Sequence, residues 1–364
     1  MKILVVMKRF GSNKDMVLEN FGRQIRLFEQ LAKKHRIDFL CPDYVKKESK
    51  IVKRNGLRFI VKSAGFFSVI GLLKSLDDLI KKESYDVMVA STDPLIGAVC
   101  YRFSKKHNIP FVYDLQDNFE SYDSYKMPSV PYFHKKAVKE AGIVLAVSEA
   151  LKKYISSTRK KPTYVINNGI DLELFKTIDK SKSRQKLKLP LDAKIIVFIG
   201  ALERLKGYDT MAKAFSKVRQ KYPNTYLLLS GKINKDVDIN QKNIIFREFP
   251  KRKDVVFAIN AADVAIIPNP VNEFTEYSFP YKLVEYMACK VPIVATSVGD
   301  VSLMLKYYPG SLCRPNDADD LASKIINKLK NYKRVDYSKE LKKLDWKALA
   351  GKLDKILMKN GNNN

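Results

Sequence analysis

A lysine and a glutamate in the second half of the chain could together bind a charged, hydroxyl-rich ligand. Lys206 precedes Gly207 at the expected start of a helix, shortly after the apolar run 195–199 and Gly200. Backbone N–H groups and a lysine at a helix entrance converge on an anion, which suits phosphate. Glu285 lies near the first turn of another expected helix, where its carboxylate can accept two hydrogen bonds from a ribose diol. These residues favour nucleotide binding, and the alternatives are a solvated lysine and an ordinary loop–helix–strand unit.

Polar side chains also crowd one place in the first half. A strand predicted at 108–114 is followed by a cluster of acidic and amide residues: Asp114, Gln116, Asp117, Glu120 and Asp123. Open α/β sheets bind ligands at the carboxyl ends of their strands. The cluster is therefore a second candidate site, although a merely solvated acidic loop would have the same composition.

Short apolar runs alternate with helical patterns along the chain and would position these residues. The runs lie at 2–7, 37–40, 85–91, 108–114 and 141–148 in the first half, and at 195–199, 226–230, 244–246, 264–268 and 291–295 in the second. Helical spacing is found at 20–33, from 208 onwards, at 321–329 and at 346–358. Buried strands alternating with helices predict doubly wound parallel sheets. The segment that begins at Phe274 is expected to start as a loop.

The length of 364 residues favours two domains over one core. The turn signal Asn168-Gly169 ends the first half, and the polar stretch 176–190 that follows is expected to be a linker. We therefore predict a first domain of residues 1–173 and a second of 174–344.

The composition limits the protein's location and partners. The sequence has no long apolar run, no secretory leader pattern and no CxxC among its four cysteines, so we expect a cytoplasmic protein. The formal net charge is +28, and the excess of Lys and Arg is spread over both halves, 31 to 19 in residues 1–173 and 36 to 20 in the remainder. No nucleic-acid-binding motif accompanies it, so an anionic membrane surface is the expected partner and nucleic acid is not. Lys-rich genome composition is the alternative explanation.

A basic amphipathic segment in the first half could contribute to membrane binding. Its apolar stripe consists of Phe66, Phe67, Ile70, Leu73, Leu76 and Ile80, with lysines around it. Such a segment can lie in a membrane interface. More often such a stripe packs on the sheet of its own domain.

The stretch SFPYKLVEYMACKVPIVAT resembles the donor-site signature of glycosyltransferase family 4, the large retaining GT-B family. The residues that match its Pro–x–Lys–x–x–Glu–Tyr–Met–Ala and Pro–x–Val patterns are Pro280, Lys282, Glu285, Tyr286, Met287, Ala288, Pro292 and Val294. Gly200, Leu202, Lys206 and Gly207 match the family's Gly–x–Leu–x–x–x–Lys–Gly pattern, and the turn Asn–Gly–Ile–Asp at 168–171 also matches. The resemblance is specific over 195–296, moderate over 108–175 and weak at the N-terminus.

The resemblance implies a GT-B fold, in which two Rossmann-like α/β domains with parallel sheets face each other across a cleft. It also implies that the last helix, 345–360, crosses back to the first domain. Arg204 and Lys206 would stabilise the leaving diphosphate, and Asp117 would contact the acceptor or the sugar. The implied donor-binding residues are Gly11, Gly200, Lys206, Pro250, Tyr277, Ser278, Phe279, Pro280, Lys282 and Glu285.

Four positions depart from the family pattern. Lys290 replaces a glycine, Ala201 replaces an arginine for which Arg204 could substitute, and Tyr277 stands where many members have a first glutamate. Gln116 stands where some members carry a histidine near the transferred sugar. These departures concern the sugar-contacting groups more than the ribose-contacting Glu285.

The resemblance thus implies a retaining glycosyltransferase that needs neither metal nor cofactor and uses a nucleotide-diphosphate sugar as donor. The acceptor would be a glycan or lipid-linked saccharide in cell-surface polysaccharide or glycolipid biosynthesis. The protein would be cytoplasmic and could be peripheral on the inner membrane face. A nucleotide-sugar epimerase of the same fold and a non-catalytic membrane-associated scaffold are the alternatives.

Overall fold

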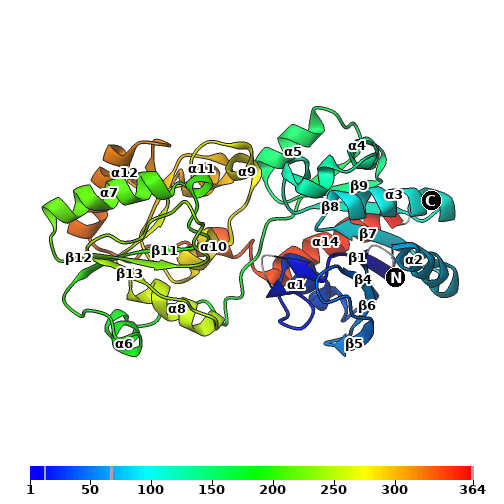
Figure 1. Cartoon of the computed structure of the whole chain (residues 1–364), viewed down its shortest axis with the longest axis horizontal. Helices are drawn as coiled ribbons and strands as arrows, with labels where there is room; N and C mark the ends of the chain where they lie inside the picture. The colour runs from blue at the N-terminus through cyan, green and yellow to red at the C-terminus, as the bar shows by residue number, and fades with distance from the viewer. Residues whose placement is uncertain (12–13, 66–68, 362–364) are drawn as a thin grey trace. The chain divides into compact units, whose positions relative to one another are not determined.

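A computed structural model describes residues 1–11, 14–65 and 69–361. The chain forms two compact units, one of residues 1–167 with the segment from Trp346 onwards, and one of residues 168–345. Helix α14 (Trp346–Gly361) packs beside α1 (Arg23–Leu31) in the first unit, as Figure 1 shows. Residues 168–173, which the sequence placed in the first domain, lie with the second unit.

The first unit contains an eight-stranded sheet, five of whose strands lie in the expected apolar runs. Its order is β10 (Thr163–Val165), β9 (Ile143–Ala146), β8 (Phe111–Leu115), β7 (Val87–Ser91), β1 (Lys2–Val6), β4 (Arg36–Asp43), β6 (Leu57–Ser63) and β5 (Lys50–Arg54). All neighbouring strands are parallel except β5 and β6, which are antiparallel, so the expectation of a purely parallel sheet is wrong at this edge. The two strands are joined by the tight turn Asn55-Gly56, both with positive φ, and such a short connection can only reverse the chain.

Helices and a short hairpin complete this unit. The helices are α1, α2 (Val69–Glu83), α3 (Pro94–His107), α4 (Val130–Glu140), α5 (Glu149–Ser156) and α14. The hairpin of β2 (Phe10–Gly11) and β3 (Lys14–Asp15) follows the carboxyl end of β1. The carboxyl edge of the sheet thus carries the hairpin and the acidic loop after β8.

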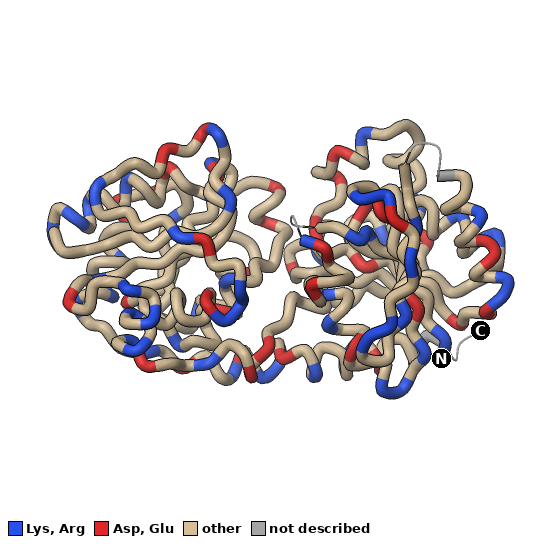
Figure 2. The backbone as a smooth tube through the Cα atoms, turned by 60° about the horizontal axis from the view of Figure 1, so that its bottom comes forward, with Lys and Arg blue, Asp and Glu red and all other residues tan. Residues whose placement is uncertain are grey.

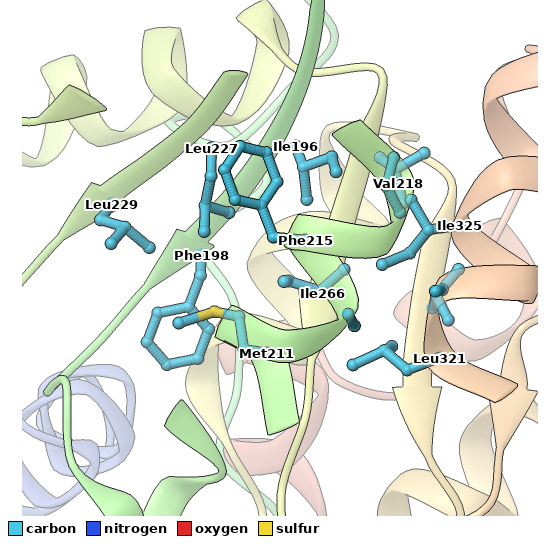
Figure 3. Packing of buried hydrophobic residues seen from close by; sticks show 14 of the residues in the cluster. Ile196, Phe198, Met211, Phe215, Val218, Leu227, Leu229, Ile266, Leu321 and Ile325 are labelled. Carbon is cyan, nitrogen blue, oxygen red and sulfur yellow. The ribbon is translucent and has the colours of Figure 1, made fainter. Parts of the chain in front are cut away.

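The second unit contains a six-stranded, all-parallel sheet. Its order is β13 (Ile244–Phe246), β12 (Thr225–Ser230), β11 (Lys194–Ile199), β14 (Val264–Ile267), β15 (Ile293–Thr296) and β16 (Leu312–Cys313). Helices α7 (Tyr208–Lys221) and α12 (Ala318–Lys330) pack on one face, and Figure 3 shows Phe215 and Ile325 of these helices turned into the core with Phe198 of β11. Because residues of β11 and β14 are packed in this core, the ends of both strands, where the loops to the candidate site begin, are held in place.

The predicted linker at 176–190 contains a helix, α6 (Lys180–Lys186), which belongs to the second unit. Asp179 caps it by accepting a hydrogen bond from the N–H of Lys182. Arg184 is buried and forms a 2.7 Å ion pair with Asp263. The helix has little apolar periodicity because its buried residues are Ser183 and Arg184, so the linker interpretation was wrong.

The segment around Phe274 also differs from the expectation of a loop. Residues Glu273–Tyr277 form a short helix, α9, in which Asn272 and Thr275 form a capping box. The expected helix follows as α10 (Tyr281–Ala288), and the expected strand is β15. Between α9 and α10, residues 278–280 form no helix or strand, and the backbone is extended at Ser278 and Pro280.

Helix α2 contains much of the segment considered for membrane binding. Leu76 and Ile80 are buried in the first unit, so this half of the apolar stripe is not available to a membrane, and that part of the prediction is wrong. Ile70 is 79% exposed, whereas Phe66 and Phe67 lie outside the described residues.

Figure 2 shows Lys and Arg distributed over both units. In the described ranges, no helix has both the length and the apolarity needed to cross a bilayer.

Three helices remain to be given for the second unit. They are α8 (Arg252–Ala261), α11 (Gly299–Leu305) and α13 (Ser338–Leu341). Of these, α8 follows the loop after β13 and brings its first residue to the candidate site.

Candidate donor site in the second unit

Lys282 and Gly200 meet at the carboxyl end of β11. Gly200 has a φ of 146°, and its N–H donates to the carbonyl of Ser230 at 2.8 Å. A Cβ at this position would lie only 2.8 Å from Nζ of Lys282, so the glycine leaves room for the ammonium group. The same Nζ lies 3.7 Å from the ring centroid of Phe198, a cation–π contact. The sequence therefore places a positive charge against the exposed end of the central strand.

Lys206 comes from the connection between β11 and α7, which begins at Gly200, and it ends the 3₁₀ turn Arg204–Lys206. Its Nζ lies 3.4 Å from the carboxylate of Glu203 and 5.4 Å from the ring centroid of Phe274. The turn is held close to the end of β14, because a Cβ on Gly207 would lie 1.8 Å from the carbonyl oxygen of Pro268. The φ of Gly207 is 85°, which also favours glycine.

The two lysines influence each other electrostatically. Burial, and then the positive charge of Lys206, lowers the pKa of Lys282 to about 7. The cost of holding these ammonium groups near each other would be offset by an anion bound between them. A diphosphate is the kind of anion that such a pair, together with the N-terminus of α10, can hold.

Glu285 lies on α10 and is 5% exposed. Its Oε1 is 3.0 Å from Nη1 of Arg252, the first residue of α8. Burial raises the pKa of the Glu285 carboxyl, and Arg252 opposes that rise. The carboxylate is thus fixed in place by a partner that sequence reasoning did not identify.

Four of the predicted donor-binding residues form the connection between α9 and α10. Tyr277 is the last residue of α9 and is half-buried, Ser278 is its C-cap, and Pro280 is the N-cap of α10. Phe279 is buried, and its carbonyl accepts a 2.7 Å hydrogen bond from the side-chain amide of Asn168. The connection therefore has a defined course that directs the N-terminus of α10.

Arg204 and Pro250 lie at the borders of this arrangement. The side chain of Arg204 is 62% exposed and lies near the carboxylates of Asp209 at 3.5 Å and Asp236 at 3.7 Å. Its guanidinium therefore has acidic partners of its own. Pro250 is exposed in the loop between β13 and α8, shortly before Arg252.

The remaining predicted site residues, Gly11 and Asp117, belong to the first unit. Gly11 lies in the hairpin after β1, next to Met16, whose sulfur would be 3.1 Å from a Cβ at Gly11. Asp117 follows β8, is half-buried, and accepts hydrogen bonds from the N–H of Asn118 at 3.0 Å and the hydroxyl of Tyr122 at 3.5 Å.

A buried polar network lies beneath the loop of Asp117. Arg23 donates to the Asp114 carboxylate at 2.9 Å, and the hydroxyl of Ser91 donates to the other Asp114 oxygen at 2.7 Å. The amide of Gln24 donates to Ser91 and to the side-chain oxygen of Gln116. Of the predicted acidic cluster, Asp114 is therefore an internal structural group and not a ligand-binding one.

Sequence reasoning missed several residues that shape the donor site. Arg252 contacts Glu285, and Tyr286 accepts a 2.9 Å hydrogen bond from the N–H of Ile199, which ties α10 to the end of β11. Asn272 donates to the carbonyl of Leu205 at 3.0 Å and so joins α9 to the Lys206 turn. The capping pattern Asn-x-x-Thr could have identified Asn272, whereas nothing local marks Arg252 within the basic run 251–253.

Two family models match this chain. The model described as "Glycosyl transferases group 1" matches residues 179–344, and the one described as "Glycosyltransferase Family 4" matches residues 25–174. The two matches correspond closely to the two units and together cover most of the sequence.

Curated relatives carry related names. A Bacillus subtilis protein, provisionally named a teichuronic acid biosynthesis glycosyltransferase, is 28% identical over 63% of this chain and 57% of its own length. The D-inositol 3-phosphate glycosyltransferase of Mycobacterium marinum is 26% identical over 54% of this chain and 44% of its own. The chain thus spans about half the length of these two relatives.

Solved structures share the fold over the whole chain. Sucrose-phosphate synthase from Thermosynechococcus elongatus has a TM-score of 0.79 at 17% identity, with 100% of each chain covered. HepE from Anabaena, solved with UDP and glucose, has a TM-score of 0.74 at 18% identity, with 99% of this chain and 100% of that chain covered. At these identities the likeness shows the fold, which is the GT-B fold expected from the sequence.

The family models and the GT-B neighbours agree with the motif residues of the second unit. They favour a transferase over the epimerase and scaffold alternatives. The chain belongs to glycosyltransferase family 4.

Proposed function

We propose that this enzyme transfers a sugar from a nucleotide-diphosphate sugar, and that the second unit binds this donor. The observation that carries the proposal is the position of Lys282 against Gly200, where burial and the nearby positive charge of Lys206 lower the pKa of Lys282. Glu285, on the same helix as Lys282, would accept the ribose hydroxyls, with Arg252 fixing its position. Pro250 and the segment 277–280 would border the nucleotide and the sugar.

The names of structural neighbours support a nucleotide sugar as donor. HepE from Anabaena has been solved with UDP and with UDP-glucose. We therefore give UDP-sugars the first place in a binding panel, with GDP- and ADP-sugars beside them.

The chemistry we propose follows from the positive charge at this site. The bond between the anomeric carbon and the donor phosphate oxygen breaks, and a bond from the acceptor oxygen to that carbon forms. The leaving diphosphate takes the acceptor proton, and Lys206 and Lys282 stabilise its negative charge. Attack on the face that the diphosphate leaves would retain the anomeric configuration. Arg204 would assist from the edge, while independence from metal stays a prediction.

The acceptor we propose is a hydroxyl of a glycan or of a lipid-linked saccharide in cell-surface polysaccharide or glycolipid synthesis. The name of the Bacillus subtilis relative, which refers to teichuronic acid biosynthesis, supports a glycan acceptor. Asp117, at the carboxyl end of β8, would contact this acceptor or the transferred sugar, and Gly11 would let the hairpin approach the substrates.

We further propose that the enzyme works at the cytoplasmic face of an anionic membrane. The support is the net charge of +28, spread over both units, and the exposed Ile70 on α2. Each Lys or Arg near such a surface contributes about 1 kcal/mol. Flotation with anionic vesicles at low salt, lost at high salt, is the expected result, and equal binding to neutral vesicles would contradict the electrostatic account.

Calorimetry with a panel of nucleotide sugars tests the donor assignment. We expect one sugar nucleotide to bind the wild type and to bind Lys206→Ala much more weakly. Lys213→Ala, which removes an exposed lysine from α7, is the matched control and should bind like the wild type. Equal affinity of the Lys206 and Lys213 variants would refute the proposed site. Once the donor is identified, incorporation of its labelled sugar into a lipid extract tests the acceptor class.

A further inference from the structure

A carboxylate that the proposed donor chemistry does not use lies beside Lys206. The Glu203 carboxylate is 3.4 Å from Nζ of Lys206, and the two side chains are 29% and 25% exposed. Glu285 of the same site differs, because it has a cation of its own in Arg252 at 3.0 Å. In the described part of the chain, Lys206 is the one cation that forms an ion pair with Glu203. Glu203 is therefore paired with the lysine that the diphosphate needs.

The backbone holds Glu203 at the start of the Lys206 turn. The carbonyl of Glu203 accepts hydrogen bonds from the N–H of Lys206 at 3.0 Å and from the N–H of Tyr208 at 3.3 Å. The preceding residue, Leu202, is fully buried, and its N–H donates to the carbonyl of Lys232 at 2.8 Å. Because the chain is fixed on both sides of Glu203, the turn keeps a negative charge beside any anion that Lys206 binds.

The charge of Glu203 also acts on the second lysine of the site. Burial and the positive charge of Lys206 lower the pKa of Lys282, whereas the negative charges of Glu285 and Glu203 oppose this fall. Of these two carboxylates, only Glu285 is also paired with an arginine. Glu203 therefore supplies negative charge to both lysines when no diphosphate is bound.

Such a carboxylate has two effects of opposite sign on a bound diphosphate. By orienting Lys206 it would raise diphosphate affinity about twofold, the usual size for ion pairs three residues apart. By repelling an anion at a separation on the order of 6 Å, it lowers the affinity about tenfold for each negative charge, a value between those for bulk water and for a protein surface. Repulsion is therefore the larger effect.

This repulsion acts more strongly on the product than on the donor. The diphosphate of a nucleotide sugar is esterified at both ends, whereas the released nucleoside diphosphate has a free terminal phosphate. A terminal phosphate loses its second proton near pH 6, at about the same place as a phosphorylated side chain, so the product carries more negative charge. A site with lysines alone would hold this product more tightly than the donor and slow its release, a step that limits turnover in many enzymes.

We propose that Glu203 limits the affinity of the enzyme for its nucleoside diphosphate product and so speeds product release. The Glu203 carboxylate repels the bound product, and it pairs with Lys206 again when the product leaves, so the lysine is not left without a counter-charge. Glu203 acts through its charge and through Lys206, and it needs no contact with the reacting atoms. This inference rests on the proposed function, since it concerns the same donor site.

Calorimetry on the full chain with matched pairs of product and donor tests the proposal. The pairs are UDP with UDP-glucose, GDP with GDP-mannose and ADP with ADP-glucose, at about pH 6.5, where a bound diphosphate keeps Lys282 charged. Glu203→Gln keeps the size of the side chain and removes its charge. For the pair that binds the wild type, this variant should bind the nucleoside diphosphate about tenfold more tightly and the sugar nucleotide only about threefold more tightly.

Two further variants separate the charge of Glu203 from its other properties. Glu203→Asp keeps the charge and should bind both ligands within about twofold of the wild type. Asp319→Asn is the matched control, because it removes one negative charge from the same unit at a position on α12 that is 79% exposed. It should bind like the wild type, and the melting temperatures of Asp319→Asn and Glu203→Gln should equal that of the wild type.

Two readouts that a structural role would not change complete the test. Inhibition by the product should become about tenfold stronger in Glu203→Gln, in line with its affinity. Without the charge of Glu203 the pKa of Lys282 falls further, so the proton uptake on product binding should begin at a lower pH than in the wild type.

Unchanged or weaker product affinity in Glu203→Gln would overturn the inference. An equal gain for product and sugar nucleotide, or an equal gain in Asp319→Asn, would overturn it as well. If no pair binds the wild type, the proposed function is rejected and this inference with it. If a pair binds the wild type and Lys206→Ala weakens it, while Glu203→Gln leaves product affinity unchanged, the inference alone is rejected.

Discussion

The carboxyl ends of the two sheets carry charged residues in opposite arrangements. In the first unit, the guanidinium of buried Arg9 lies within 2.9 Å of the carboxylates of Asp15, Asp43 and Glu48, so charges of opposite sign are paired there. In the second unit, Lys206 and Lys282 lie near each other, and burial and mutual repulsion lower the pKa of Lys282. Matched charges stabilise a loop, whereas like charges held together favour a bound anion. The comparison indicates which basic residues are structural and which belong to the donor site.

The largest expected effect concerns Arg9. Arg9→Met leaves buried Asp15 and Asp43 without their cation, and breaking a buried pair in this way costs about 3–5 kcal/mol. Denaturant unfolding measures the loss. Arg314→Met is the control, because Arg314 is 76% exposed in its pair with Asp317, and such surface pairs contribute about 0–1 kcal/mol. Similar losses in both variants would remove the distinction between matched and exposed charges.

Next in size is the effect of removing a lysine from the donor site. Lys206→Ala or Lys282→Ala should lower turnover on the order of 10²–10³-fold, the usual cost of losing one group that stabilises developing charge. The melting temperature should change little, since neither lysine holds a matched buried network. Steady-state kinetics with the identified donor measures the effect. Near-wild-type turnover of both variants would assign phosphate stabilisation to other groups.

Glu285→Gln should weaken donor binding by about 1.5–3 kcal/mol, the range for hydrogen bonds to charged groups. Competition calorimetry with the nucleoside diphosphate measures this loss, and Arg252→Ala serves as the companion variant because Arg252 holds the carboxylate at 3.0 Å. Donor affinity that is unchanged in a folded Glu285→Gln protein would contradict the ribose-binding role.

The pKa of Lys282, lowered to about 7, predicts a pH dependence of donor binding. A bound diphosphate raises this pKa, so the complex holds more protons than the free enzyme above neutral pH. Donor affinity should therefore fall as the pH rises above about 7, with proton uptake visible as a buffer-dependent binding enthalpy. Lys282→Met should bind weakly with little pH dependence, and an unchanged pH profile in that variant would assign the titration to another group.

The smallest effect should come from Arg204. Its side chain is 62% exposed and lies near Asp209 and Asp236, so its charge is partly compensated and screened by water. Arg204→Ala should reduce turnover less than Lys206→Ala, measured under the same conditions. An equal or greater reduction would show that Arg204 turns toward the donor during the reaction.

Local sequence pattern was sufficient for most strands of the two sheets and for the donor motif. The apolar runs that became β1, β11 and β15 are buried on both faces and therefore have a composition that few other elements share. The sequence also identified Gly200, Lys206 and Lys282, because their types and spacing match the donor motif. In that motif a glycine lets the backbone come close to the ligand, and lysines supply positive charge at the same place. Strands β5 and β6 and helix α6 were missed. Strand β5 is short and half-exposed, and the buried residues of α6 are Ser183 and Arg184, so neither element has apolar periodicity.

By itself, the sequence determined the two-domain α/β architecture and the family, because buried strands, turn residues and the donor motif are encoded in short stretches. The tertiary structure decided which distant residues meet: Arg252 with Glu285, Asn168 with Phe279, and Tyr286 with the end of β11. It also decided that Leu76 and Ile80 pack inside the first unit and that Lys282 has a lowered pKa. Burial and the distance between charges are properties of the folded chain, and residues far apart in sequence set both.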